Sequence, residues 1–327
     1  MPIDRRTLIG GAAASLALAP AARAQDGPTP YVLGTGTAAW PPREHFKLWP
    51  GTPPGAPNPL PANNFTVNGS FRELWLRGVS EPMVGVYRPA RPDGRAVLSI
   101  PGGGYGFVSV ENEGVDVAKA LAPHGITVFV LAYRLPGEGW ANRADVPLQD
   151  AQRAMRLIRA NAGKYGVDPA RLGLVGFSAG GHLGGTLAVG HDDKVYAAID
   201  AADALSARPA YAGLVYPAVS FHSAGFEERR SNGLWGESTG PETRARYTPL
   251  TRVTPATPPI FLVHAMDDGT VPVQQSLAMI EACRTHKVPV EAHLFEKGGH
   301  GFGALHLPTD LPGHLWPDLF ARWTAKQ

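Results

Sequence analysis

A serine in a glycine-rich pentapeptide is the first side chain in this sequence whose setting could make it reactive. Residues 176–180 read Gly-Phe-Ser-Ala-Gly, which matches the pattern Gly-x-Ser-x-Gly around Ser178. With 39 glycines in 327 residues the bare pattern is weak, because a serine in an ordinary loop also satisfies it. A serine hydroxyl becomes a nucleophile only when a base removes its proton and a third group orients that base. Nucleophilic chemistry at Ser178 therefore requires a base and an acid elsewhere in the chain.

The candidate base is His300. It lies in residues 298–303, which read Gly-Gly-His-Gly-Phe-Gly and follow the apolar run Val290–Phe295. Among the 11 histidines of the chain, it is the one in a glycine-rich turn after the last expected strand. Open α/β sheets place their functional side chains at the carboxyl ends of strands, so this position suits a base that must reach Ser178.

Two adjacent aspartates, Asp267 and Asp268, are the candidate acids. They come just after the apolar run Ile260–Ala265. In the order serine, acid, histidine, either aspartate leaves room for one strand–helix unit before His300. Both could instead cap a helix that begins near Pro272, which is a common role of aspartate. The spacing favours Asp268, with Asp267 as the alternative.

A run of three glycines is the candidate for stabilising negative charge. Residues 101–105 read Pro-Gly-Gly-Gly-Tyr and follow the strand-like run Ala96–Ile100. Glycine lets the backbone turn its N–H groups toward a developing oxyanion. A flexible turn or a phosphate-binding loop are the alternatives, but no Lys-Ser or Lys-Thr follows, and Val108 interrupts the Gly-x-Gly-x-x-Gly spacing. The expected oxyanion-hole donors are the backbone N–H groups of Gly103, Gly104 and Ala179.

The elements that must position these residues alternate between strands and helices. Unbroken apolar runs such as residues 126–132 are typical of strands buried on both faces of a parallel sheet. Ser178 then lies on the sharp strand-to-helix turn that an exposed nucleophile requires. The alternation implies right-handed crossovers, and so predicts an α/β fold with a mainly parallel central sheet and helices on both faces. We expect strands at residues 71–77, 83–87, 96–100, 126–132, 171–176, 212–219, 260–265 and 290–295, and helices at 115–121, 147–162, 179–190, 272–286 and after 312.

The chain divides into three parts. Residues 1–24 combine a pair of arginines, a weakly apolar centre rich in alanine and glycine, and a small-x-small cleavage site, as in a twin-arginine signal peptide. Residues 25–64 are aperiodic and rich in proline and glycine, which predicts an extended N-terminal arm. Residues 65–327 are expected to form one domain. Within it, residues 220–258 have no clear strand and several aromatic side chains, which favours an ordered flap over a site.

Composition limits the partners that this protein could have. Thirty Lys and Arg residues against 28 Asp and Glu give a formal charge of +2, which is not typical of a nucleic-acid-binding protein. The single cysteine, Cys283, excludes an internal disulfide, and no His-Glu-x-x-His spacing occurs, so no metal or other cofactor is expected. No segment is apolar over enough residues to span a membrane. We expect a protein exported to the periplasm or outside the cell, and the sequence does not fix its oligomeric state.

The three glycine-containing motifs together resemble those of α/β-hydrolase-fold serine esterases. They are residues 101–105, residues 176–182 (Gly-Phe-Ser-Ala-Gly-Gly-His) and residues 298–303. Within that superfamily the chain is similar to bacterial acetylxylan-esterase-like proteins, some of which are named after xylanases. This resemblance covers most of residues 45–325 and identifies the acid as the aspartate of the Asp-x-x-Val-Pro run, Asp268. Relatives of the hormone-sensitive-lipase type begin the glycine run with histidine where this chain has proline, which favours the acetylesterase branch.

The resemblance implies hydrolysis of a carboxylic ester through an acyl-enzyme, with Ser178 as nucleophile, His300 as base and Asp268 orienting the imidazole. Together with export, it implies acetyl groups on polysaccharide or oligosaccharide as the substrate. Two alternatives stay open. One is a serine peptidase of prolyl-oligopeptidase type, although the chain lacks room for the propeller domain of such enzymes. The other is an inactive α/β-hydrolase that serves as a binding module. Four tryptophans could stack on sugar rings, namely Trp40, Trp49, Trp140 and Trp235. Packing in the core is the more common role of a tryptophan.

Overall fold

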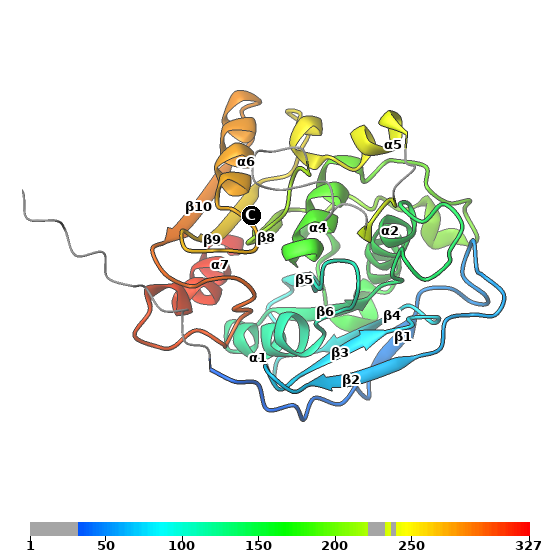
Figure 1. Cartoon of the computed structure of the whole chain (residues 1–327), viewed down its shortest axis with the longest axis horizontal. Coiled ribbons are helices and arrows are strands. Elements are labelled where there is room, and N and C mark those ends of the chain that lie inside the picture. Colours follow the sequence, from blue (N-terminus) through cyan, green and yellow to red (C-terminus); the bar gives the residue numbers. More distant parts are fainter. Residues whose placement is uncertain (1–31, 222–232, 237–239) are drawn as a thin grey trace, which may run out of the picture.

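A mainly parallel sheet forms the centre of the molecule (Figure 1). The structure is a computed structural model that describes residues 32–221, 233–236 and 240–327, so the expected signal peptide lies outside the described residues. Within the described ranges, the sheet order is β1 (His45–Lys47), β4 (Met83–Tyr87), β6 (Thr127–Ala132), β5 (Ala96–Ile100), β7 (Leu172–Phe177), β8 (Ala212–Val215), β9 (Ile260–Ala265) and β10 (Val290–Phe295). The pairs β1–β4 and β4–β6 are antiparallel, and every later pair in this order is parallel, which confirms the predicted α/β class. A second, two-stranded sheet pairs β2 (Asn64–Asn68) with β3 (Glu73–Arg77).

Helices cover both faces of the central sheet. The α-helices in the described ranges are α1 (Asp116–Leu121), α2 (Val146–Ala160), α3 (Ala162–Tyr165), α4 (Ser178–Gly190), α5 (Pro241–Arg246), α6 (Gln274–Thr285) and α7 (Trp316–Thr324). A Cβ added to Gly213 of β8 would lie 2.8 Å from the ring of Phe320 in α7, whereas the next residue, Leu214, packs near Gly184 of α4. Successive strand residues point to opposite faces, so α7 and α4 lie on opposite sides of the sheet. No helix in the described ranges is both long and apolar enough to cross a bilayer.

The strand register brings the expected motifs to one edge of the sheet. Ile100, the last residue of β5, pairs with Gly176 of β7, so the glycine run follows β5 beside Ser178. In the same way Ala265 of β9 pairs with Phe295 of β10, so the turns that carry the aspartates and His300 leave the sheet at the same level. Parallel pairing thus collects side chains that lie far apart in the sequence.

The arm at residues 25–64, as far as it is described, is part of the same core. Its residues 45–47 form edge strand β1, and the next two side chains, Leu48 and Trp49, are buried. The indole of Trp49 donates to Asp150 at 2.8 Å, and Arg153 donates to the carbonyl of Leu48 at 3.0 Å. Polar residues of helix α2, such as Asp150 and Arg153, are therefore buried together with its apolar ones, because the arm covers them.

The expected strand at residues 212–219 is shorter than predicted, because β8 ends at Val215. The next residue, Tyr216, has a φ of 38°, in the left-handed region that a strand cannot include. Its hydroxyl donates to Glu113 at 2.8 Å and accepts from the backbone N–H of Gly303 at 2.9 Å. These two contacts fix the Tyr216 side chain at the point where the backbone leaves the sheet.

Residues 220–258, expected to form a flap, are described in part. Residues 222–232 and 237–239 lie outside the described ranges, and α5 lies within this segment. The aromatic side chains of Phe221 and Trp235 are buried and meet edge to face at a centroid distance of 5.2 Å.

Candidate active site

Ser178 lies on a strained turn between β7 and α4. Its φ of 52° is left-handed, which costs an L-residue about 1–2 kcal/mol. The flanking glycines are required by close approach. A Cβ at Gly176 would lie 2.3 Å from the carbonyl oxygen of Gly180, and a Cβ at Gly180 would lie 2.0 Å from that of Ile100. The Gly-x-Ser-x-Gly pattern therefore reflects a turn packed directly against the glycine run.

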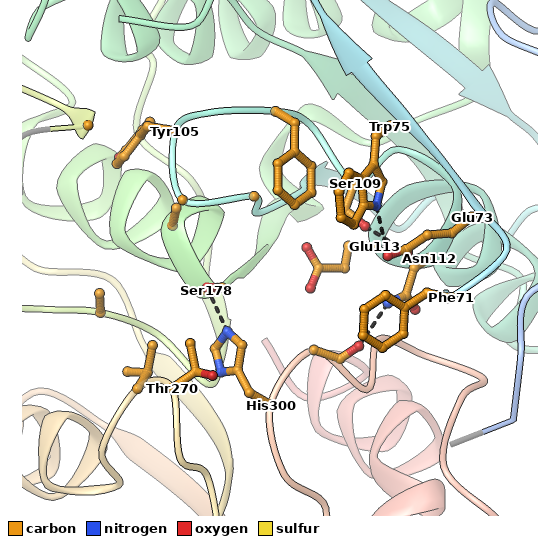
Figure 2. A pocket seen from close by; sticks show the side chains of 18 of the residues that line it. Phe71, Glu73, Trp75, Tyr105, Ser109, Asn112, Glu113, Ser178, Thr270 and His300 are labelled. Carbon is orange, nitrogen blue, oxygen red and sulfur yellow. Dashed lines mark hydrogen bonds between the residues drawn. The ribbon is translucent and has the colours of Figure 1, made fainter. Parts of the chain in front are cut away.

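The structure brings Ser178, His300 and Asp268 into one hydrogen-bonded chain (Figure 2). Ser178 Oγ lies 2.9 Å from His300 Nε2, and His300 Nδ1 lies 2.7 Å from Asp268 Oδ2. The His300 side chain is 17% exposed and that of Asp268 is fully buried, so the serine end of the chain faces the solvent side. This is the arrangement in which a carboxylate orients an imidazole that takes a proton from a serine hydroxyl.

Asp268 is held as a carboxylate by four contacts. Its Oδ1 accepts from the backbone N–H groups of Thr270 and Val271, each at 2.8 Å. Its Oδ2 contacts His300 at 2.7 Å and His264 at 3.1 Å. Burial alone would raise the pKa of Asp268, but the hydrogen bonds from His264, His300 and the backbone outweigh it and lower the pKa to about 2. A negative charge next to His300 is therefore present throughout the neutral range.

Asp267, the alternative acid, contacts the turn next to His300, whereas Asp268 contacts the imidazole ring itself. Its Oδ1 accepts from the backbone N–H of Gly299 at 2.8 Å, so it contacts the backbone of the turn that carries His300. The two adjacent carboxylates thus contact neighbouring parts of one turn, and Asp268 is the one that reaches the imidazole.

The glycine run forms a turn beside Ser178. Gly103 and Gly104 have φ values of 124° and 59°, and both line the same pocket as Ser178 and Ala179. A Cβ at Gly103 would lie 2.1 Å from the carbonyl oxygen of Phe107, so other residues are excluded there. The N–H of Gly102 donates to Glu113 Oε2 at 2.6 Å, so it already has a partner within the protein. The three residues expected to supply oxyanion-hole donors, Gly103, Gly104 and, at the start of α4, Ala179, all line the pocket beside Ser178, and their role as donors stays a prediction.

A pocket of about 620 Å³ opens beside the Ser178–His300 pair. Figure 2 shows Phe71, Glu73 and Trp75, which come from β3 and the turn before it, on the opposite side of the pocket. The ring of Trp75 stacks on that of Phe107 at a centroid distance of 3.8 Å. This wall combines aromatic faces with carboxyl groups. The expected tryptophans are not among the side chains that line the pocket, and Trp49, Trp140 and Trp235 are buried.

Three side chains near the site were not predicted. His264 in β9 contacts Asp268, Val271 and Ser276. The available signal was that His264 is the one polar residue in the otherwise apolar run Ile260–Ala265. Tyr216 packs its ring 4.8 Å from that of His300. Glu113 lines the pocket, and burial raises its pKa to about 8. For Glu113, the available signal was a pair of acidic residues, Glu111 and Glu113, between valines shortly after the glycine run.

The arrangement places a base and an acid in hydrogen-bond contact with a serine hydroxyl, as nucleophilic chemistry at Ser178 requires. Across the described residues, no three His, Cys, Asp or Glu side chains are grouped so that they could hold a metal ion.

Comparison with known proteins gives the family. The BD-FAE family model matches residues 84–283. The chain is 34% identical over 206 residues to endo-1,4-beta-xylanase B of Butyrivibrio fibrisolvens, and 29% identical over 221 residues to an acetylxylan esterase of Xylanibacter ruminicola. These matches cover 63% and 66% of this chain but only 32% and 43% of the relatives, so the chain spans about a third to two fifths of their length.

A solved structure matches over nearly its whole length. The acetyl ester-xyloside bifunctional hydrolase from Caldicellulosiruptor lactoaceticus is 32% identical, with a TM-score of 0.67. The match covers 86% of this chain and 96% of that one. Both the family model and this structure agree with the resemblance found in the sequence motifs. The chain therefore belongs to the BD-FAE family of α/β-hydrolase-fold esterases.

Proposed function

We propose that the protein hydrolyses carboxylic esters through a serine acyl-enzyme. The observation that carries this proposal is the continuous Ser178–His300–Asp268 chain, with contacts of 2.9 and 2.7 Å, next to a glycine turn at the base of a pocket. In this mechanism His300 Nε2 takes the Ser178 proton as Oγ attacks the ester carbonyl carbon. Asp268 holds the imidazole in the tautomer with Nδ1 protonated and stabilises the imidazolium that forms.

The tetrahedral intermediate then collapses. Its oxyanion accepts hydrogen bonds from the backbone N–H groups of Gly103, Gly104 and Ala179. His300 returns the proton to the alkoxide as the carbon–oxygen bond of the ester breaks, and the alcohol leaves. Water, deprotonated by the same imidazole, attacks the acyl-enzyme and releases the carboxylic acid, which restores Ser178.

We propose acetyl groups on polysaccharide or oligosaccharide as the substrate. The named activities of similar proteins, an acetylxylan esterase and an acetyl ester-xyloside hydrolase, support this choice. So does a pocket wall in which the aromatic ring of Trp75 lies beside the carboxyl group of Glu73, because sugars offer both apolar faces and hydroxyl groups. Export directed by residues 1–24 would bring the protein to such substrates, and we retain it as part of the proposal.

The test is covalent labelling combined with substrate profiling. A fluorophosphonate probe should label the wild-type protein and not the Ser178→Ala variant, whose fold, measured by circular dichroism, should be unchanged. The wild type should release acetate from acetylated xylan and prefer p-nitrophenyl acetate to the octanoate. Absence of labelling would favour an inactive binding module, and cleavage of proline-containing peptides without ester turnover would favour a peptidase. Either result would contradict the proposal.

A further inference from the structure

Glu113 is a buried carboxyl group that the mechanism above does not use. It comes from a π-helical turn at Glu111–Val115 that directly precedes α1, and it is 3% exposed. Its Oε2 accepts from the backbone N–H of Gly102 at 2.6 Å, and its Oε1 accepts from the hydroxyl of Tyr216 at 2.8 Å. Figure 2 shows its side chain between the Ser178–His300 pair and Trp75. Turns of this kind often occur at functional sites.

These two contacts reach both halves of the site. Gly102 begins the glycine turn, and a Cβ there would lie 2.9 Å from Ser178 Cβ, so this turn is in direct contact with the nucleophile. The Tyr216 hydroxyl also accepts from the N–H of Gly303 at 2.9 Å, three residues after His300. One side chain therefore connects the backbone of the expected oxyanion hole with the turn that carries the histidine.

We propose that Glu113 is a positioning residue, whose carboxyl group holds the glycine turn and, through Tyr216, the histidine turn in place around Ser178. This inference rests on the proposed ester hydrolysis and assigns a role within it. Correct placement is worth a large factor in rate, because a misplacement of about 1 Å can reduce turnover about 100-fold.

The effect of Glu113 on turnover depends on whether its carboxyl group is neutral or ionised. The titratable groups around it are Glu73 from β3, Tyr133 after β6, Tyr216 after β8 and, beyond Tyr216, His300. Burial raises the pKa of Glu113 to about 8, against the lowering effect of the hydrogen bonds from Gly102 and Tyr216, and the charge on Glu73 raises it further. At pH 7 the group is therefore mostly neutral, and the 2.8 Å contact is then made with the proton on Oε1, which donates to the Tyr216 hydroxyl. Ionisation above pH 8 would place a negative charge in the pocket, close to the developing oxyanion, and should slow the reaction.

The test measures kcat and KM for p-nitrophenyl acetate from pH 6 to 9.5, corrected for spontaneous hydrolysis. Glu113→Gln keeps a neutral group with an acceptor for Gly102, and the Tyr216 hydroxyl can rotate to accept from the amide. Glu113→Met keeps the volume and removes both contacts. Glu111→Gln is the matched control, because Glu111 lies on the same buried turn but contacts Leu74 and Thr35. Tyr216→Phe removes only the connection to the histidine turn, and serves if Glu113→Met fails to fold.

The expected changes in kcat, KM and pH profile distinguish a positioning role of Glu113 from a purely structural one. Glu113→Met should lower kcat about 10- to 100-fold with KM changed less than about threefold, and Tyr216→Phe should lower kcat about tenfold. Wild-type kcat should fall about tenfold between pH 7 and pH 9, as expected for one group with a pKa near 8. Glu113→Gln should stay within about threefold of wild type at pH 7 and lose this alkaline decline, whereas Glu111→Gln should keep it.

Two results would overturn the inference. One is a kcat for both Glu113→Met and Tyr216→Phe equal to that of the wild type, and the other is an unchanged alkaline decline in Glu113→Gln. Neither would affect the proposed hydrolysis itself, which stands or falls with fluorophosphonate labelling of Ser178 and ester turnover by the wild-type protein. The failure of the positioning role and the failure of the proposed function are thus distinguishable.

Discussion

Replacing Asp268 with asparagine removes one charge from the buried end of the hydrogen-bonded chain while keeping the shape of the side chain. The lowered pKa of about 2, against an ordinary value of 3.8, means that the charged form stabilises the folded protein by about 2 kcal/mol. This stabilisation is complete above the ordinary pKa and is lost as the pH falls through about 2. We therefore expect Asp268→Asn to lower the free energy of unfolding by about 2 kcal/mol or more at pH 7, and the difference from wild type to shrink below pH 4.

The effect on turnover should be larger than the effect on stability. In the variant, the amide can face His300 Nδ1 with its own N–H group, which favours the wrong tautomer of the imidazole and leaves the imidazolium without a counter-charge. Loss of an orienting carboxylate in this way lowers kcat about 10³- to 10⁴-fold. The measurement is kcat for p-nitrophenyl acetate together with urea unfolding at pH 7 and at pH 3.

Asp267→Asn is the matched control for this experiment. Asp267 accepts from the backbone N–H of Gly299, and an asparagine oxygen can accept the same bond, so kcat should fall less than about tenfold. If Asp267→Asn lost activity about 10³-fold while Asp268→Asn stayed within tenfold of wild type, the assignment of the acid would be wrong.

Three further predictions follow from individual contacts. Gly180→Ala should destabilise the fold by about 3 kcal/mol or more in thermal unfolding, because its Cβ would collide with backbone carbonyl groups, whereas Gly163→Ala, with nothing within 4 Å, should be neutral or stabilising. His264→Ala leaves a cavity and unpaired polar groups at a buried site, so urea unfolding should show a loss of about 2–4 kcal/mol; a loss below 1 kcal/mol would refute its supporting role. Trp75→Ala should raise KM for acetylated xylo-oligosaccharides about tenfold, which corresponds to one aromatic stacking contact, and leave that for p-nitrophenyl acetate nearly unchanged. Equal effects on both substrates would argue against a sugar at this wall.

Much of the fold could be predicted because it rests on local patterns. The apolar runs at β6, β7 and β9, the last interrupted only by His264, each match a strand within a residue or two, and parallel pairing then fixes which edge of the sheet carries the site. The positions of Ser178 and His300 follow from glycines that only a tight turn needs. These features depend on a few neighbouring residues, so the sequence displays them directly.

Other features depend on contacts between distant residues and could not be predicted. Tyr216 ends β8 because its hydroxyl is held by Glu113 and Gly303, which lie about a hundred residues away on either side. Arg153 is buried because the arm covers it, a contact that the residues around it in the sequence do not display. The pocket wall at Trp75 was missed for the same reason, since a tryptophan in a short strand gives no sign of which surface it faces.

The two-stranded sheet of β2 and β3 contributes to the pocket wall but not to the Ser178–His300–Asp268 contacts, so the wall and these contacts can change independently. It supplies Glu73 and Trp75 to the pocket, and it joins the rest of the molecule through Leu76, which pairs with Val108. None of the hydrogen bonds that connect Ser178, His300 and Asp268 passes through it. Under the proposed function, we expect mutations in this hairpin to alter which alcohol is accepted and to leave the Ser178–His300–Asp268 contacts in place. The hairpin is the natural segment to exchange or randomise when new specificities are sought on this scaffold.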